Sequence, residues 1–77
     1  MNKSRRESLS TISEELESIK SRLEDVSDEE REAYDNLPEN LQYSSRGESM
    51  QYGLDELIEA AENLDSTIEH INNVIEE

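Results

Sequence analysis

The chain contains no cysteine, no tryptophan and no phenylalanine, and it has one proline and two glycines in 77 residues. The absence of cysteine excludes disulfides, thiolate catalysis and zinc–thiolate sites, and it fits a reducing compartment. No apolar run approaches the roughly 18 residues that cross a bilayer, and residues 1–6 lead into no signal-peptide core. We therefore expect a soluble, cytoplasmic protein that does not enter a membrane.

Positive charge is also scarce, because 7 Lys and Arg residues stand against 21 Asp and Glu residues, for a net charge of −14. Nucleic acids and anionic membranes are themselves negative, so direct binding to either is disfavoured. If charge selects a partner, that partner is a basic protein.

Two apolar tracts with the same spacing, alternating three and four residues, occupy the two halves of the chain. Such a repeat keeps one edge of a helix facing a partner helix. We call the line along which the two edges meet the seam. Read in opposite directions, the tracts mirror each other about Asn40, which predicts an all-α fold, an antiparallel two-helix hairpin of coiled-coil type. The mirrored pairs are Leu9 with Ile71, Ile12 with Ile68, Leu16 with Leu64, Ile19 with Ala61, Leu23 with Leu57 and Val26 with Leu54.

Only 31% of the residues are hydrophobic, so the chain forms at most one domain, over residues 1–77, and has little interior. In a lone two-helix hairpin, the ordering of the chain costs about as much free energy as side-chain burial contributes. We therefore expect a homo-oligomer, a dimer or higher, that forms a helical bundle. Ile58 and Val74 support this expectation, because they widen the apolar stripe beyond what one partner helix covers.

The first helix is expected at about residues 4–34. Ser4 with Glu7 has the capping-box spacing, in which each side chain bonds a free backbone amide at the start of a helix. Ser27 with Glu30 repeats this signature, so a break near Val26 is an alternative to the continuous helix that we favour.

The connection is expected at about residues 35–45 and the second helix at about 46–75. Pro38 disfavours helical angles in the residue before it and opens a short turn. Ser45 with Glu48 is a further capping-box candidate. Gly47 and Gly53 lower helix propensity near this start, which indicates either local fraying or a close backbone contact.

Acidic residues dominate the second helix, which has no Lys or Arg after Arg46. Five of them recur at every seventh residue and form what we call the acidic line: Glu48, Asp55, Glu62, Glu69 and Glu76. The line imitates nucleic-acid phosphates, or it only keeps the outer face of the helix soluble. The candidate partner-binding residues are Glu48, Asp55, Glu59, Glu62 and Glu69.

The connection is rich in leucine and tyrosine for a simple turn. Arg46 and the backbone amides near Gly47 lie at a helix N-terminus, where an anion or a partner's carboxylate could be held. In the alternative interpretation, the apolar residues close the end of the seam and the polar ones fix the helix ends. The candidate residues of this hairpin tip are Leu37, Glu39, Leu41, Tyr43 and Arg46.

Neither catalysis nor metal binding is indicated. His70, the single histidine, falls on the outer side of the seam, where we expect it to be solvated. The acids lack the Glu-x-x-His pairs of di-iron bundles, and residues 25–30 lack the pattern of a calcium-binding loop. We expect no enzyme and no cofactor. The basic residues near the N-terminus are expected to meet the acidic C-terminus as weak exposed ion pairs: Lys3, Arg5 and Arg6 with Glu76 and Glu77.

The segment DEEREAYDNLPENLQ at residues 28–42, with SRGESM at residues 45–50, resembles a group of small acidic helical proteins encoded by bacteriophages and prophages, especially of Gram-positive hosts. The opening NKSRR at residues 2–6 is similar to that group too. The resemblance implies a viral or mobile-element origin and brings no catalytic residues.

These observations favour a phage-encoded interaction protein that binds and blocks a host protein, a nucleic-acid-handling or defence enzyme, through its acidic face and tip. A second hypothesis is an oligomeric sponge for a nucleotide signal held around Arg46. A third is a structural or assembly helper that contributes only its helices.

Overall fold

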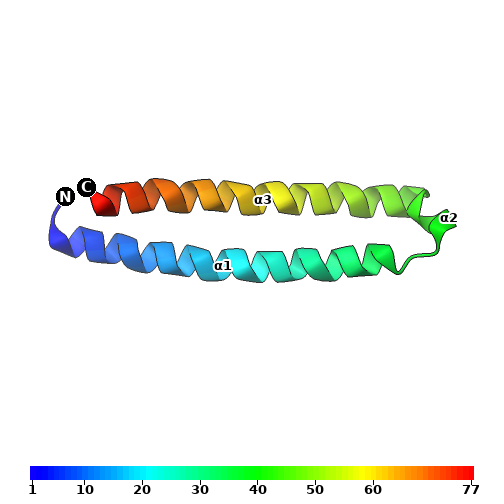
Figure 1. The fold of residues 1–77 in the computed structure, drawn as a ribbon, viewed down its shortest axis with the longest axis horizontal. Helices are drawn as coiled ribbons and strands as arrows, with labels where there is room; N and C mark the ends of the chain where they lie inside the picture. The colour runs from blue at the N-terminus through cyan, green and yellow to red at the C-terminus, as the bar shows by residue number, and fades with distance from the viewer.

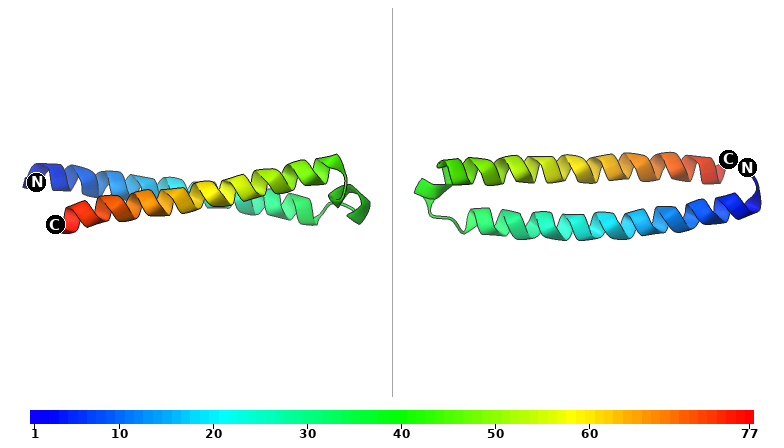
Figure 2. Two further views of the ribbon diagram at one scale, coloured as in Figure 1. Left: turned by 90° about the horizontal axis from the view of Figure 1, so that it is seen from above. Right: turned by 180° about the vertical axis from the view of Figure 1, so that it is seen from behind.

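The computed structural model describes all 77 residues and consists of three helices: α1 (Lys3–Asp35), α2 (Glu39–Gln42) and α3 (Ser45–Glu76). The long helices α1 and α3 pack side by side in opposite directions, and both termini lie at one end (Figure 1). Seen from above, the two helices cross at a shallow angle (Figure 2). The result is a rod of 58 × 15 × 12 Å. The predicted all-α hairpin is confirmed.

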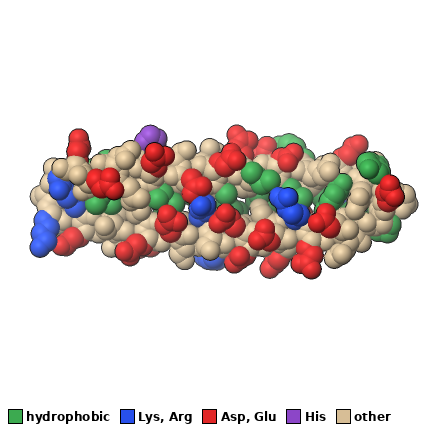
Figure 3. All heavy atoms as spheres, viewed as in Figure 1, with side chains coloured by type: hydrophobic (Ala, Val, Ile, Leu, Met, Phe, Trp, Pro, Cys, Tyr) green, Lys and Arg blue, Asp and Glu red, His purple; other side chains and the backbone are tan.

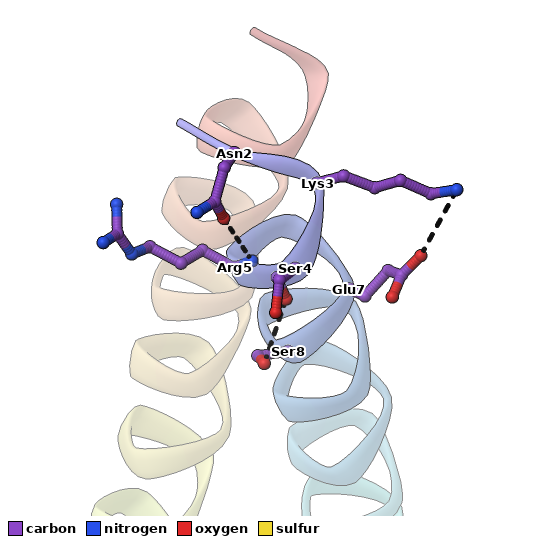
Figure 4. A network of polar contacts seen from close by, with 6 residues as sticks. All are labelled: Asn2, Lys3, Ser4, Arg5, Glu7 and Ser8. Atoms are coloured by element: carbon purple, nitrogen blue, oxygen red, sulfur yellow. Dashed lines mark hydrogen bonds and ion pairs between the residues drawn. The ribbon is translucent and has the colours of Figure 1, made fainter.

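The start of α1 differs from the expected capping box. Asn2 is the N-cap, and its side-chain Oδ1 accepts a hydrogen bond of 2.9 Å from the Arg5 amide (Figure 4). Ser4 lies inside the first turn, where its carbonyl accepts from the Ser8 hydroxyl. Asn caps a helix start as well as Ser does, so the helix begins slightly earlier than predicted.

The helix α1 continues through Val26 and Ser27 without interruption, as we favoured. Ser27 does not cap a new helix, because its side chain is turned toward α3 and is buried. Burial against the partner helix therefore overrides the local start signal.

The tip is built around Gln42 and Gly47. The Gln42 Nε2 donates to the carbonyls of Tyr34 and Leu37, 3.2 Å away in each case, which satisfies backbone oxygens at the end of α1. Gly47 is buried, and a Cβ on it would lie 2.0 Å from the Gln42 carbonyl oxygen. Of the two interpretations for the glycines, Gly47 fits the close backbone contact, whereas a Cβ on Gly53 would have no neighbour within 4 Å.

The start of α3 is shifted by one residue from the expected capping box. Ser44 is the N-cap, and its side chain donates to the Leu41 carbonyl and caps no amide. The α2 turn brings this carbonyl within reach, and the hydroxyl bonds it in preference to the α3 amides.

The α3 edge of the seam is as predicted. Leu54 and Ile68 are the buried hydrophobic residues of the molecule, with 7% and 4% of their surface exposed. The remaining members of the edge are half-buried: Leu57, Ala61, Leu64 and Ile71.

For the α1 edge of the seam, the prediction is wrong for half of the residues. Ile12, Ile19 and Val26 are 44%, 47% and 53% exposed. The residue after each of them takes the inner position instead, so α1 is rotated relative to the prediction. These inner residues are Ser13 and Ser27, both buried, and Lys20, half-buried.

The rotation of α1 has a physical reason that hydrophobicity alone does not show. Leu9, Leu16 and Leu23 belong to both possible edges, so either rotation keeps them half-buried beside α3. The observed rotation adds polar pairs between the helices, which recur at multiples of seven residues in opposite directions along α1 and α3. These pairs are Ser13 Oγ with Asn72 Oδ1 at 2.9 Å, Lys20 Nζ with Asp65 Oδ1 at 2.6 Å, and Tyr34 Oη with Gln51 Nε2 at 2.9 Å.

Candidate interaction surfaces

The hairpin has two unlike sides, separated by the seam. The polar pairs between α1 and α3 lie on one side, which we call the polar side. Helical geometry turns the residue before each inner α1 residue, Ser13, Lys20 and Ser27, toward the opposite side. The α3 residues two beyond Gln51, Asp65 and Asn72 face the same way. That side carries apolar or small residues, and we call it the apolar side: Ile12, Ile19 and Val26 of α1 with Gly53, Thr67 and Val74 of α3, and Ala60 in the same row.

The polar side carries a shallow groove of about 460 Å³ between the middle parts of α1 and α3. Five carboxylates line the groove against two cations, so its net charge is negative. The carboxylates are Glu24, Asp25, Asp28, Glu62 and Asp65, and the cations are Lys20 and Arg31.

The positive charge of Lys20 is already paired with a carboxylate within this groove. Its side chain is 20% exposed and lies 2.6 Å from the Asp65 carboxylate. The hydrogen bond to Asp65 raises the pKa of the Lys20 ammonium above its ordinary value, and desolvation opposes part of that rise. Neighbouring Glu24 and Glu17 raise the pKa of Lys20 further. The remaining carboxylates are free to meet a positive partner.

The predicted partner-binding acids are all exposed. The members of the acidic line follow the edge of α3 beside the polar side, about 10.5 Å apart at 1.5 Å per residue. None of them takes part in an ion pair, since the two ion pairs of the molecule are Lys20–Asp65 and Lys3–Glu7. Figure 3 shows carboxylates spread along both helices, with apolar side chains visible between them. The exposed candidates are Glu48, Asp55, Glu59, Glu62 and Glu69.

The predicted tip residues differ in how far they are exposed. Leu37 is half-buried, which is consistent with the interpretation in which it closes the end of the seam. Leu41 and Tyr43 do not close it, because they are 36% and 77% exposed. Glu39 and Arg46 are exposed and make no side-chain hydrogen bond or ion pair. The tip therefore exposes apolar side chains, Leu41 and Tyr43, as well as charged ones, Glu39 and Arg46.

The expected tether between the two chain ends is not formed. Lys3 pairs with Glu7 of its own helix at 4.0 Å, and both side chains point away from α3 (Figure 4). Arg6 is half-buried, and its Nε is enclosed without a hydrogen-bond partner. No ion pair reaches Glu76 or Glu77.

Sequence reasoning missed the residues that set the rotation of α1. Ser13 and Asn72 carry no motif, and each resembles an ordinary surface residue by itself. The available signal was their periodicity, because Ser13, Lys20 and Ser27 recur every seven residues directly beside the leucines. Gln42 was likewise missed as the residue that joins the tip to α1.

No helix of the molecule has the length and apolarity needed to span a membrane. No three or more His, Asp or Glu side chains are grouped so that they could hold a metal ion. No family model matches the chain, and neither a curated protein nor a solved structure is significantly similar to it.

Proposed function

We propose that the protein is a non-enzymatic, bacteriophage-encoded interaction protein that binds and inhibits a basic host protein, a nucleic-acid-handling or defence enzyme. The observation that carries the proposal is the exposed, unpaired acidic line beside a groove that itself holds five carboxylates and two cations. A surface of this kind attracts proteins whose own sites are built to hold phosphates.

The shape of the molecule supports this proposal. The acidic line runs along a rod 58 Å long, and the carboxylates are held at regular intervals by one unbroken helix. A basic nucleic-acid channel meets phosphates in a similar linear order. Arg or Lys side chains of the target would enter the groove near Glu62 and Asp28, while exposed Tyr43 adds an apolar anchor at the tip.

Charge reversal on the acidic line tests the proposal. Tagged protein captures its target from host lysate, and the activity of the purified captured enzyme is then measured with and without the chain. The substitutions Asp55→Lys, Glu62→Lys and Glu69→Lys together should weaken binding at least tenfold, and binding of the unmodified chain should fall as salt rises.

A matched control changes the net charge equally but on α1, where Glu14, Glu29 and Glu32 become Lys. These three residues are exposed and do not line the groove, so binding should stay within a few-fold of the original. An equal loss of binding in both triple variants would show that net charge alone, and not the acidic line, determines binding. Capture of no enzyme, or salt-independent binding, would contradict the proposal.

A further inference from the structure

We infer that the apolar side is the interface with a second copy of this chain, packed face to face as an antiparallel four-helix bundle in which α1 lies on α1 and α3 on α3. This deepens the self-association expected of the proposed protein. It leaves the acidic side of both copies exposed, so its test can fail without affecting the proposed inhibition.

Surface area supports an unfilled interface. A compact monomer of this mass exposes about 4,800 Å² by the usual scaling. The hairpin exposes 5778 Å². The excess, about 1,000 Å² per chain, is close to the roughly 800 Å² that each partner buries in a standard interface.

Three exposed β-branched residues gather on one side, whereas Ile58, 40% exposed, lines the groove on the polar side. Ile12, Ile19 and Val26 form an exposed row along α1, and the leucines beside them are only half-buried by α3. The row and the leucines together have the alternating spacing of three and four residues that fits a second partner helix. A shallow depression on α1, lined by Ile19, Leu23 and Val26 together with the charged residues Arg22 and Asp25, offers a place for an apolar side chain.

Charges at the border of the apolar side select the antiparallel arrangement. On α1, Glu15 and Arg22 lie one heptad apart, beyond the isoleucine row. A two-fold axis near Ile19 places Glu15 of each copy beside Arg22 of the other, so the interface is self-complementary. A parallel arrangement of α1 with α1 would instead place equal charges together.

The corresponding border of α3 gives the same axis independently. Glu56 and His70 lie symmetrically about Asn63, so an axis near Asn63 brings each Glu56 beside His70 of the other copy. The midpoints on the two helices lie within about one helical turn, 5.4 Å, of the same level, because Lys20 is paired with Asp65. A single two-fold axis across the hairpin therefore satisfies both borders.

Side-chain size also matches across this axis. Ile12 of one copy meets Val26 of the other, which pairs two β-branched residues. On α3 the axis places Gly53 opposite Val74, a small residue facing a larger one, and a Cβ at Gly53 meets nothing within 4 Å inside its own hairpin. The space above Gly53 is thus filled by the second copy.

Single cysteines test the arrangement cleanly, because the chain has none of its own. Under mild oxidation, Ile19→Cys should cross-link to itself as a covalent dimer. Ile12→Cys should cross-link with differently tagged Val26→Cys in a mixture and at least tenfold less with itself. Ser21→Cys, at an exposed position bordering the groove, is the matched control and should stay monomeric on the same gel.

Charge exchange gives a second readout in sedimentation equilibrium. Arg22→Glu and Glu15→Arg should each weaken the dimer by about three- to tenfold, and an equimolar mixture of the two should recover it as a heterodimer. Self-cross-linking of Ile12→Cys at the rate of Ile19→Cys would overturn the antiparallel arrangement. A folded monomer that persists at high micromolar concentration would overturn the interface itself.

Discussion

At the scale of single residues, small and polar side chains decide the geometry that the leucines leave open. Gly47 allows the α2 turn to lie against α3, and Gln42 joins that turn to the end of α1. Ser13 and Ser27 allow α1 to approach α3 with little of either side chain exposed. Each of these residues acts through its small volume or its hydrogen bonds.

The two glycines of α3 should respond oppositely to alanine. Gly47→Ala places a methyl group on the Gln42 carbonyl oxygen, so we expect the free energy of unfolding to fall by about 1–3 kcal/mol. At protein concentrations too low for dimers, Gly53→Ala has open space in the lone hairpin and gains helix propensity, so it should raise that free energy by about 0.5–1 kcal/mol. Urea denaturation followed by circular dichroism measures both. Equal effects of one sign would contradict the tip geometry.

The Lys20–Asp65 pair should stabilise the fold in a pH-dependent way. Because the pKa of Lys20 is raised in the folded state, the pair contributes fully below the ordinary lysine pKa of about 10.4. Its contribution is lost as pH rises through the raised pKa. Melting temperatures of the original chain and of Lys20→Met should therefore converge above that pKa. A difference that stays constant from pH 8 into the alkaline range would refute the pair's role.

At the scale of elements, the sequence predicted the helices better than their orientation. The bounds of α1 and α3 fall within one residue of the expected ones, because periodicity and Pro38 determine them. The seam was ambiguous on α1, since the shared leucines fit two edges. The choice between Ile19 and Lys20 as the inner residue depends on Asp65, which lies 45 residues further along the chain. Local spacing carries no information on such a pair.

Substitutions at the seam and on the apolar side should distinguish the stability of the hairpin from the stability of the dimer. Leu54→Ala or Ile68→Ala removes a buried side chain and should lower the free energy of unfolding by about 2–4 kcal/mol at every protein concentration. Ile19→Ala removes a side chain that is 47% exposed in the hairpin, so its effect should grow with concentration as dimers form. Thermal melts over a hundredfold concentration range measure the difference. A concentration-independent loss in Ile19→Ala would place Ile19 in the hairpin core.

At the scale of the whole molecule, the rotation of α1 gives each side of the rod a separate role. Apolar residues that would otherwise meet α3 are turned outward, where a second copy would cover them in the assembly that we propose. The acidic line and the groove remain on the outer surfaces of such a dimer. Each dimer would then present two equivalent acidic sides, one per chain, so we expect two target molecules per dimer. Both proposals depend on α1 facing α3 with Ser13 and Lys20.

An intramolecular disulfide tests that orientation most directly. The Ser13 hydroxyl and the Asn72 side chain are 2.9 Å apart, so the double variant Ser13→Cys with Asn72→Cys should close within one chain under oxidation, at any protein concentration. Ile12→Cys with Asn72→Cys is the matched control, because Ile12 lies on the opposite side of the seam. We predict a reducible, monomer-sized cross-link in the first variant and none in the second. Closure of the Ile12 variant in place of the Ser13 variant would show that α1 does not face α3 in this orientation.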